Sequence, residues 1–495
     1  MEHLAKIFKS RESIFYIIVS FCVFIYILFT LLNYDVNWMH PEVAKFQIPY
    51  IFENGRSFLF ADFLRCFNCL RFDLNYRSRF LSYLSQIVNS KFRIWLFNFI
   101  PPHPSLSLTW IFTFILSPFF LFRLVDNLTS NRIASWISVL LYVASSGCLS
   151  LAIMLFHPAK PLSNFLAIFC LYLASRINLS IKSKGEFSQN DVRLYIALLF
   201  ILFLAFFSDE TAYFIFPCIP LFFPRIFKTK NNSGLIFLVY CLTFVGFLMF
   251  VTFVAPIIIR HLGFGNFDYW GYVIARITTD RSNLWKLSAF NNIFLSGHYL
   301  LSSHIVPFRR PDLNNFFKVD IYVYILFFLY CFYSFTCLSR AEKKMLKRMC
   351  AVLSLFILFN FFLIAKYSEV TTDCYYYGTL FSIFFVLPLS ILLSVKYGFL
   401  KILNKIILVF LLVVFASNFY TINQRWNYGH TYFYKLFYPK ETQQMLGNKV
   451  LTYPMVLRAW KSRNDKNVLS ELKNQFPKRA YWLFVELDYL RKYKD

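Results

Sequence analysis

The stretch SIFYIIVSFCVFIYILFTLL, residues 13–32, is followed directly by NYDVNW, residues 33–38. The first stretch is almost wholly apolar and has the length of about 20 residues that an α-helix needs to cross a bilayer. No small-residue cleavage site follows it, so we interpret it as a spanning helix and not as a signal peptide. Asp35 therefore stands where this helix leaves the membrane, with the interfacial residue types Tyr34 and Trp38 on either side.

The composition is that of a membrane protein. Of 495 residues, 58% are hydrophobic and 15% are charged, and the net charge is +26. The basic residues lie in short clusters between apolar runs and do not form a basic face on a polar module, so we expect membrane lipids as partners and no nucleic acid. Cys66 and Cys69 form the only CxxC among eleven cysteines, and without a second pair this spacing does not predict a zinc site.

Eleven apolar runs follow one another along the chain. We therefore predict an all-α polytopic membrane protein with about 11 transmembrane helices. The fourth, fifth, sixth and ninth runs are short for a full crossing. The runs are residues 13–32, 107–124, 133–156, 161–175, 194–207, 212–223, 234–259, 321–338, 351–365, 375–395 and 402–421.

Lysine and arginine in short loops orient such helices, because they are retained on the cytoplasmic side. With the N-terminus inside, 20 of them flank the cytoplasmic ends of the runs, and only Lys160 and Lys366 lie in the short loops opposite. We therefore expect a multi-pass protein of a bacterial inner membrane, with a cytoplasmic N-terminus and an extracytoplasmic C-terminus. Residues 1–421 would form the membrane domain, with extracytoplasmic loops at 33–106 and 260–320, and residues 422–495 would form a small extracytoplasmic cap.

The first long loop contains an amphipathic stretch at residues 80–99. Its apolar residues recur at helical spacing and form an apolar stripe, which predicts a helix lying in the interface. The stripe consists of Leu81, Leu84, Ile87, Val88, Phe92, Trp95 and Phe99.

Ionisable residues collect on the outer side of this topology. They are costly at the ends of spanning helices and are usually functional there. Asp35 is the candidate catalytic base. The candidate substrate-binding residues stand before the amphipathic stretch (Arg77, Arg79), in HPAK (His157, Lys160), in SDET (Asp209, Glu210) and in the second long loop (Arg309, Arg310).

Simpler explanations exist for several of these residues. Arg77 and Arg79 can extend to lipid phosphates beside an interfacial helix. His157 precedes Pro158 and can mark a helix start. Asp209 and Glu210 can cap the helix that begins near Thr211.

The order of these features resembles the glycosyltransferase-C superfamily, which includes protein O-mannosyltransferases and bacterial enzymes that use polyprenyl-phosphate sugars. The resemblance rests on Asp35 opening the first loop, on YRSRFLSYLSQIVNSKF at residues 76–92, and on HPAK and SDETAYFIFP as short outer turns. Many members have two adjacent acids where this chain has only Asp35, and a proline where Phe80 follows Arg79.

The resemblance implies an inverting transfer of sugar from a polyprenyl-phosphate donor to a glycan, lipid or protein acceptor. Asp35 would take the proton of the acceptor hydroxyl. The leaving phosphate would be held by Arg77, Arg79, Lys160 or the Arg309 and Arg310 pair. Asp209 and Glu210 would share a divalent ion, Mg²⁺ or Mn²⁺, with that phosphate or orient the acceptor.

Three alternatives stay open at this point. A flippase or transporter of lipid-linked sugars would use the same outer basic residues, but it should show broken or charged helices near the midplane. A surface-polysaccharide polymerase shares the substrate class. A catalytically inert relative would retain the fold without the chemistry.

Overall fold

The computed structural model describes residues 80–101, 108, 111–145, 147–148, 159–228, 233–261, 301, 304–306, 320–364, 379–395, 397–417, 453–475, 483–484 and 487–488. These residues form helices and turns, with no strand among them. The helices are α5 (Phe80–Leu96), α7 (Ser117–Thr129), α8 (Arg132–Ala144), α10 (Ala159–Lys184), α11 (Gln189–Phe206), α12 (Ile215–Phe222), α13 (Ser233–Met249), α14 (Ala255–His261), α18 (Ile321–Thr336), α19 (Arg340–Ile364), α21 (Thr379–Leu393), α24 (Tyr453–Lys461) and α25 (Lys466–Gln475). Short π-helical segments are η3 (Ile111–Leu116) and η6 (Phe250–Val254), and short 3₁₀ helices are η4 (Glu210–Phe214) and η5 (Pro224–Phe227). A further helical segment spans Leu400–Ser417.

Five helical segments in the described part are long and apolar enough to cross a membrane: Ile111–Thr129, Lys160–Lys184, Gln189–Phe206, Gly234–Ile258 and Leu400–Ser417. Gly234–Ile258 is the most apolar of them, yet only 17% of its apolar window is buried inside the protein. Water would penalise so much exposed apolar surface, whereas lipid does not. The chain is accordingly an α-helical protein whose described helices suit a bilayer.

Three of the four runs that are short in the sequence belong to longer helices. The run at 161–175 lies inside α10, the run at 194–207 is continued at its start by α11, and α19 begins eleven residues before residue 351. Polar residues with good helix propensity flank these runs, so the helix continues past the apolar part. The sixth run stays short, as Thr211–Phe222, and contains Pro217 and Pro220, which cannot donate backbone hydrogen bonds.

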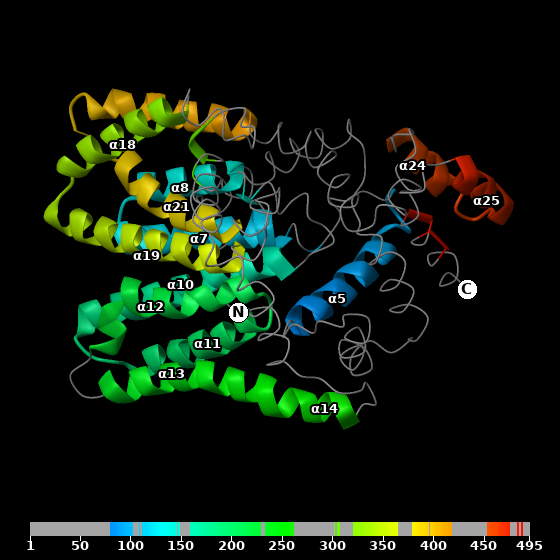
Figure 1. Ribbon diagram of the computed structural model, residues 1–495, viewed down its shortest axis with the longest axis horizontal. Coiled ribbons are helices and arrows are strands. Elements are labelled where there is room, and N and C mark those ends of the chain that lie inside the picture. Colours follow the sequence, from blue (N-terminus) through cyan, green and yellow to red (C-terminus); the bar gives the residue numbers. More distant parts are fainter. Residues whose placement is uncertain are drawn as a thin grey trace, which may run out of the picture.

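Helix α10 lies at the centre of the bundle. It packs against α7 and α11, and the series continues from α7 to α8, from α8 to α21 and from α21 to α19 (Figure 1). Phenylalanine rings fill the gaps between helices: Phe206 contacts Phe244 and Phe247 with centroids 5.3 and 5.2 Å apart. Many of the aromatic residues therefore serve interhelical packing.

Two further parts lie beside the bundle, on the right of Figure 1. The predicted amphipathic stretch is confirmed as a helix, α5, which packs against α10. The amphipathic helices α24 and α25 lie at the other end of α5, where Trp460 Nε1 donates a hydrogen bond to the Phe97 carbonyl at 2.7 Å. This bond ties the C-terminal region to the segment between the first two predicted runs.

Candidate functional site

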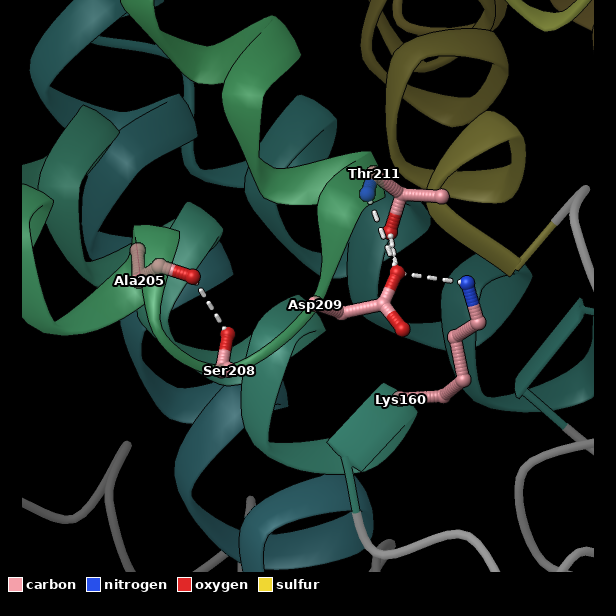
Figure 2. Close-up of polar contacts among 5 residues, drawn as sticks. All are labelled: Lys160, Ala205, Ser208, Asp209 and Thr211. Atoms are coloured by element: carbon pink, nitrogen blue, oxygen red, sulfur yellow. Dashed lines mark hydrogen bonds and ion pairs between the residues drawn. The ribbon is translucent and has the colours of Figure 1, made fainter. Parts of the chain in front are cut away.

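A buried ion pair joins the start of α10 to the turn after α11. Lys160 Nζ donates to Asp209 Oδ1 at 2.6 Å, and both side chains have an exposed fraction of 0% (Figure 2). The same carboxylate oxygen accepts hydrogen bonds from the backbone N–H of Thr211 at 3.0 Å and from the Thr211 hydroxyl at 2.7 Å. Three donors thus converge on one oxygen.

The local sequence explains this geometry. Helix α11 ends at Phe206, and Ser208 turns back so that its hydroxyl donates to the Ala205 carbonyl at 2.6 Å. Asp209 then adopts an extended backbone and caps η4 through the Thr211 N–H. An Asp in this position satisfies a backbone donor that has no partner within the helix. The capping explanation is therefore confirmed for Asp209.

The pair is energetically costly to build. Removing two charges from water carries a desolvation penalty that only close geometry and extra hydrogen bonds offset. Lys160 also stands in the first turn of α10, where the helix dipole disfavours a cation. The Asp209 carboxylate offsets both effects. Because such a buried charge pair is costly at the end of an apolar helix, Lys160 and Asp209 are candidates for a functional site.

Helix α5 begins beside this pair. The backbone N–H of Leu81 donates to the Phe207 carbonyl at 3.1 Å, two residues before Asp209. In the sequence, Arg79 directly precedes Phe80, the first residue of α5, and Arg77 stands two residues before Arg79.

The face that α5 turns to the protein is partly polar. Asn89, Arg93 and Phe97, spaced four residues apart, are all buried, whereas Trp95 and Phe99 from the predicted apolar stripe are exposed. Asn89 Oδ1 accepts a hydrogen bond from the Leu108 N–H at 2.8 Å, and the Arg93 guanidinium lies 5.4 Å from the centroid of the Phe97 ring. Trp95 and Phe99 thus lie where lipid would meet them.

A second buried polar group lies one turn further along α10. Ser163 and Asn164 stand three and four residues after Lys160, so they share its face of the helix. Ser117 of α7, Asn164 and Cys148 surround the hydroxyl of Tyr142 of α8. Ser117, Tyr142, Ser163 and Asn164 are at most 1% exposed, and their side-chain polar atoms make no hydrogen bond with another described residue.

Of the predicted site residues, the structure brings Lys160 and Asp209 together. They come from HPAK and SDET, 49 positions apart. Glu210 begins η4, and its side chain is outside the described part. Asp35, Arg77, Arg79, His157, Arg309 and Arg310 also lie outside the described residues, so the roles assigned to them stay predictions.

Several residues of this region were not predicted. Thr211 binds the carboxylate, and a hydroxyl two residues after a capping Asp is a usable signal for that contact. Arg93 and Asn164 were missed because sequence periodicity draws attention to the apolar residues around them. Elsewhere in the described part, His304 of the second long loop, which the topology places on the outer side, has its Nε2 2.8 Å from the Ser382 hydroxyl near the start of α21.

The described residues around Asp209 do not fit a divalent ion. No group of three histidine, cysteine, aspartate or glutamate side chains in the described part converges as metal ligands. Asp209 Oδ1 already receives the Lys160 ammonium, and a second cation beside it would be repelled. The expected sharing of Mg²⁺ or Mn²⁺ by Asp209 and Glu210 stays a prediction, because the Glu210 side chain lies outside the described part.

Comparison of this chain with family models, with curated proteins and with solved structures gave no match.

Proposed function

We propose that this protein is an integral-membrane glycosyltransferase that moves a sugar from a polyprenyl-phosphate donor to a glycan, lipid or protein acceptor. The observation that carries the proposal is the fully buried Lys160 and Asp209 pair at the end of the bundle where the amphipathic helix α5 begins. A lipid-linked substrate requires both features: apolar helices to receive its chain and a fixed charge where its phosphate meets the interface.

The proposed topology has eleven crossings with the N-terminus in the cytoplasm of a bacterial cell. Each predicted run from residue 107 onward overlaps a described helix, and residues 13–32 would supply the first crossing. Lys160 and Asp209 would then face the extracytoplasmic side. A phosphatase reporter fused to the C-terminus should be active, and one inserted at Gly185 should be inactive; the reverse pattern would contradict this orientation.

In the proposed reaction the acceptor oxygen attacks the anomeric carbon as the bond from that carbon to the phosphate oxygen breaks. Asp35 would take the acceptor proton, and the phosphate would leave with its negative charge. The contact of Lys160 Nζ with Asp209 Oδ1 at 2.6 Å fixes the ammonium in place. A fixed cation at the developing phosphate charge lowers the barrier because it needs no reorganisation during the reaction. Arg77 and Arg79, which precede α5, would complete the phosphate site.

The test is sugar transfer by the purified protein in proteoliposomes, with a panel of radiolabelled polyprenyl-phosphate sugars and an acceptor extract. We expect Asp35→Asn to lower turnover by 10²-fold or more, in line with the loss of a general base. Asp209→Asn should lower it by removing the charge that fixes Lys160, and Glu186→Gln, an exposed acid in the turn after α10, is the matched control.

A charge-swapped variant, Lys160→Asp with Asp209→Lys, separates folding from chemistry. The swap retains opposite charges at the same two positions but moves the ammonium to the α11 side. We expect a folded protein without transfer. Wild-type turnover in the swapped variant, or no transfer by the unmodified protein from any donor of the panel, would refute the proposal.

A further inference from the structure

Three fully buried polar side chains meet where α7, α8 and α10 pack together. They are Ser117 at the start of α7, Tyr142 near the end of α8 and Asn164 in α10, and each is at most 1% exposed. Ser117, Asn164 and Cys148 surround the Tyr142 hydroxyl. The oxygen and nitrogen atoms of Ser117, Tyr142 and Asn164 nevertheless form no hydrogen bond with another described residue.

Other buried serines of the bundle show what is unusual about Ser117. A helical serine commonly donates its hydroxyl to a backbone carbonyl of the preceding turn. Ser138 donates to the Ser135 carbonyl at 2.7 Å, and Ser390 donates to the Leu387 carbonyl at 2.8 Å. Ser117 makes no such bond, and it directly follows η3, a π-helix whose turn is wider than that of an α-helix. Its hydroxyl is therefore available to a ligand.

The amide of Asn164 is costly to bury. It offers both donors and an acceptor, and neither Nδ2 nor Oδ1 bonds a described residue. A buried polar group without a partner costs about 1–3 kcal/mol, which a leucine of similar shape would avoid. Another buried asparagine is satisfied by the protein: Asn404 Nδ2 donates to the Val395 carbonyl at 2.7 Å, and its Oδ1 accepts from the Tyr330 hydroxyl at 2.8 Å. Asn164 therefore indicates a ligand that both donates and accepts.

The closed surroundings of Asn164 restrict that ligand to a very small molecule. Water fits, because it donates two hydrogen bonds and accepts two, and a buried water makes about three bonds to polar groups that have no other partner. Ser117 Oγ and the two polar atoms of Asn164 supply three such partners. Polar groups that lie close together without bonding directly are typically bridged by water.

We propose that the cluster of Ser117, Tyr142 and Asn164 binds buried water that bridges α7 and α10. Asn164 Oδ1 accepts a hydrogen bond from the water, Asn164 Nδ2 donates one to it, and the Ser117 hydroxyl makes the third. These three bonds suffice, so the Tyr142 hydroxyl closes the site without being required to hold the water. The site lies one turn of α10 from Lys160 and has no part in the proposed reaction. The proposal is therefore independent of the proposed function.

The test is hydroxyl-radical labelling of the full chain in detergent micelles, produced by X-ray irradiation and measured by mass spectrometry. Radicals formed from a bound water modify the side chains beside it. Tyr142 and Tyr240 are both 0% exposed, but the Tyr240 hydroxyl donates to the Phe216 carbonyl at 2.6 Å, which makes Tyr240 the matched control. We expect labelling of Tyr142 and none of Tyr240. Labelling of Tyr142 no stronger than that of Tyr240 would overturn the proposal.

Mixing with water enriched in heavy oxygen, just before irradiation, separates bound water from bulk solvent. Tyr397, which is 70% exposed, should incorporate heavy oxygen at once. Tyr142 should incorporate it only after a delay, because a buried water exchanges slowly with the bulk. Simultaneous incorporation at both residues would show that bulk solvent labels Tyr142 and would overturn the proposal.

Two substitutions remove partners of the water. Asn164→Leu removes two of the three, and we expect labelling of Tyr142 to fall to the level of Tyr240. Tyr240 also reports folding, because it would become labelled in a misfolded chain. Ser117→Ala removes one partner and little volume, and should lower the labelling of Tyr142 by less. Unchanged labelling of Tyr142 in a folded variant of either kind would overturn the proposal.

Asn127→Leu is the matched control for Asn164→Leu. It removes a buried amide near the other end of α7, where Asn127 Nδ2 donates to the Ser175 hydroxyl of α10 at 2.8 Å. Fifteen residues separate Ser175 from Lys160, or about 22 Å of helix, so this amide lies at the opposite end of the bundle from the Lys160 and Asp209 pair. Labelling of Tyr142 should stay unchanged in Asn127→Leu. A loss equal to that in Asn164→Leu would overturn the proposal.

Discussion

The two ends of the helix bundle treat charge in opposite ways. At one end, Lys160 and Asp209 are fully buried and joined at 2.6 Å. At the other end, Arg132, Arg340 and Lys344 are exposed beside an open pocket of about 720 Å³. The protein itself determines the geometry of the buried pair, whereas the side chains of the two arginines and the lysine are exposed at the surface of the bundle.

This difference in burial determines how strongly the charges at each end interact. A charge interaction in a buried site is several times stronger than the same interaction in water, and its loss leaves a charge without compensation. Exposed charges are screened by salt and contribute little individually to folding. Substitutions at the two ends should therefore differ both in size and in salt dependence.

The largest effect is expected at the buried pair. Asp209→Ala leaves the Lys160 ammonium buried without its carboxylate and the Thr211 donors without an acceptor. We expect the free energy of unfolding to fall by about 3–5 kcal/mol. Unfolding in mixed detergent micelles, followed by circular dichroism, measures this loss. The double variant Lys160→Met with Asp209→Leu is the control, and we expect it to recover most of the stability because it buries no charge.

A loss below about 1 kcal/mol for Asp209→Ala, or a double variant no more stable than the single one, would show that charges at the two ends do not differ in their contribution to stability. It would indicate that water reaches the pair and screens it as it screens the exposed charges.

The joint between α5 and the C-terminal region should show an intermediate effect. Trp460→Phe removes the N–H that bonds the Phe97 carbonyl at 2.7 Å, and we expect a loss of about 1 kcal/mol. Hydrogen exchange in residues 453–475 should accelerate while exchange in α10 stays unchanged. Trp95→Phe, at a residue 58% exposed on α5, is the matched control and should leave exchange in both regions unaltered.

Much of this architecture could be predicted from the sequence, and the limits have physical causes. Apolar runs predict helices because a helix is the structure that satisfies all backbone hydrogen bonds of a single segment inside a bilayer. The runs do not predict where α10 and α19 extend into polar residues. The topology placed Lys160 and Asp209 on one side. Their pairing depends on how α10 packs against α11, which no local pattern encodes.

The buried face of α5 shows a second limit. Periodicity identifies the apolar stripe, but its members divide: Leu81 and Leu84 pack against the core, whereas Trp95 and Phe99 are exposed. The polar residues Asn89 and Arg93 are buried. In a membrane an apolar stripe has two possible partners, the protein and the lipid, so the pattern alone does not tell which face is buried.

Tyr142→Phe should have a smaller effect on the free energy of unfolding, and the sign of that effect shows whether the Tyr142 hydroxyl has a hydrogen-bond partner. The Tyr142 hydroxyl is buried and makes no hydrogen bond with another described residue, so its removal should leave stability unchanged or raise it by up to about 1 kcal/mol. The measurement is the same detergent unfolding. A loss of more than 1 kcal/mol would show that Ser117, Asn164 or a bound water satisfies the hydroxyl.

The smallest effect is expected at the basic end. Lys344→Gln removes an exposed charge from the first turns of α19, where the helix dipole already disfavours a cation. The free energy of unfolding should change by less than about 0.5 kcal/mol, with a small gain favoured at low salt. Repeating the measurement at 0.05 and 0.5 M salt tests the reason for the effect, because screening should abolish a dipole interaction at an exposed residue but not the loss caused by Asp209→Ala. If high salt also abolishes the effect of Asp209→Ala, ions and water reach the Lys160 and Asp209 pair as they reach Lys344. The proposal that the pair holds a substrate in a fixed orientation would then be refuted.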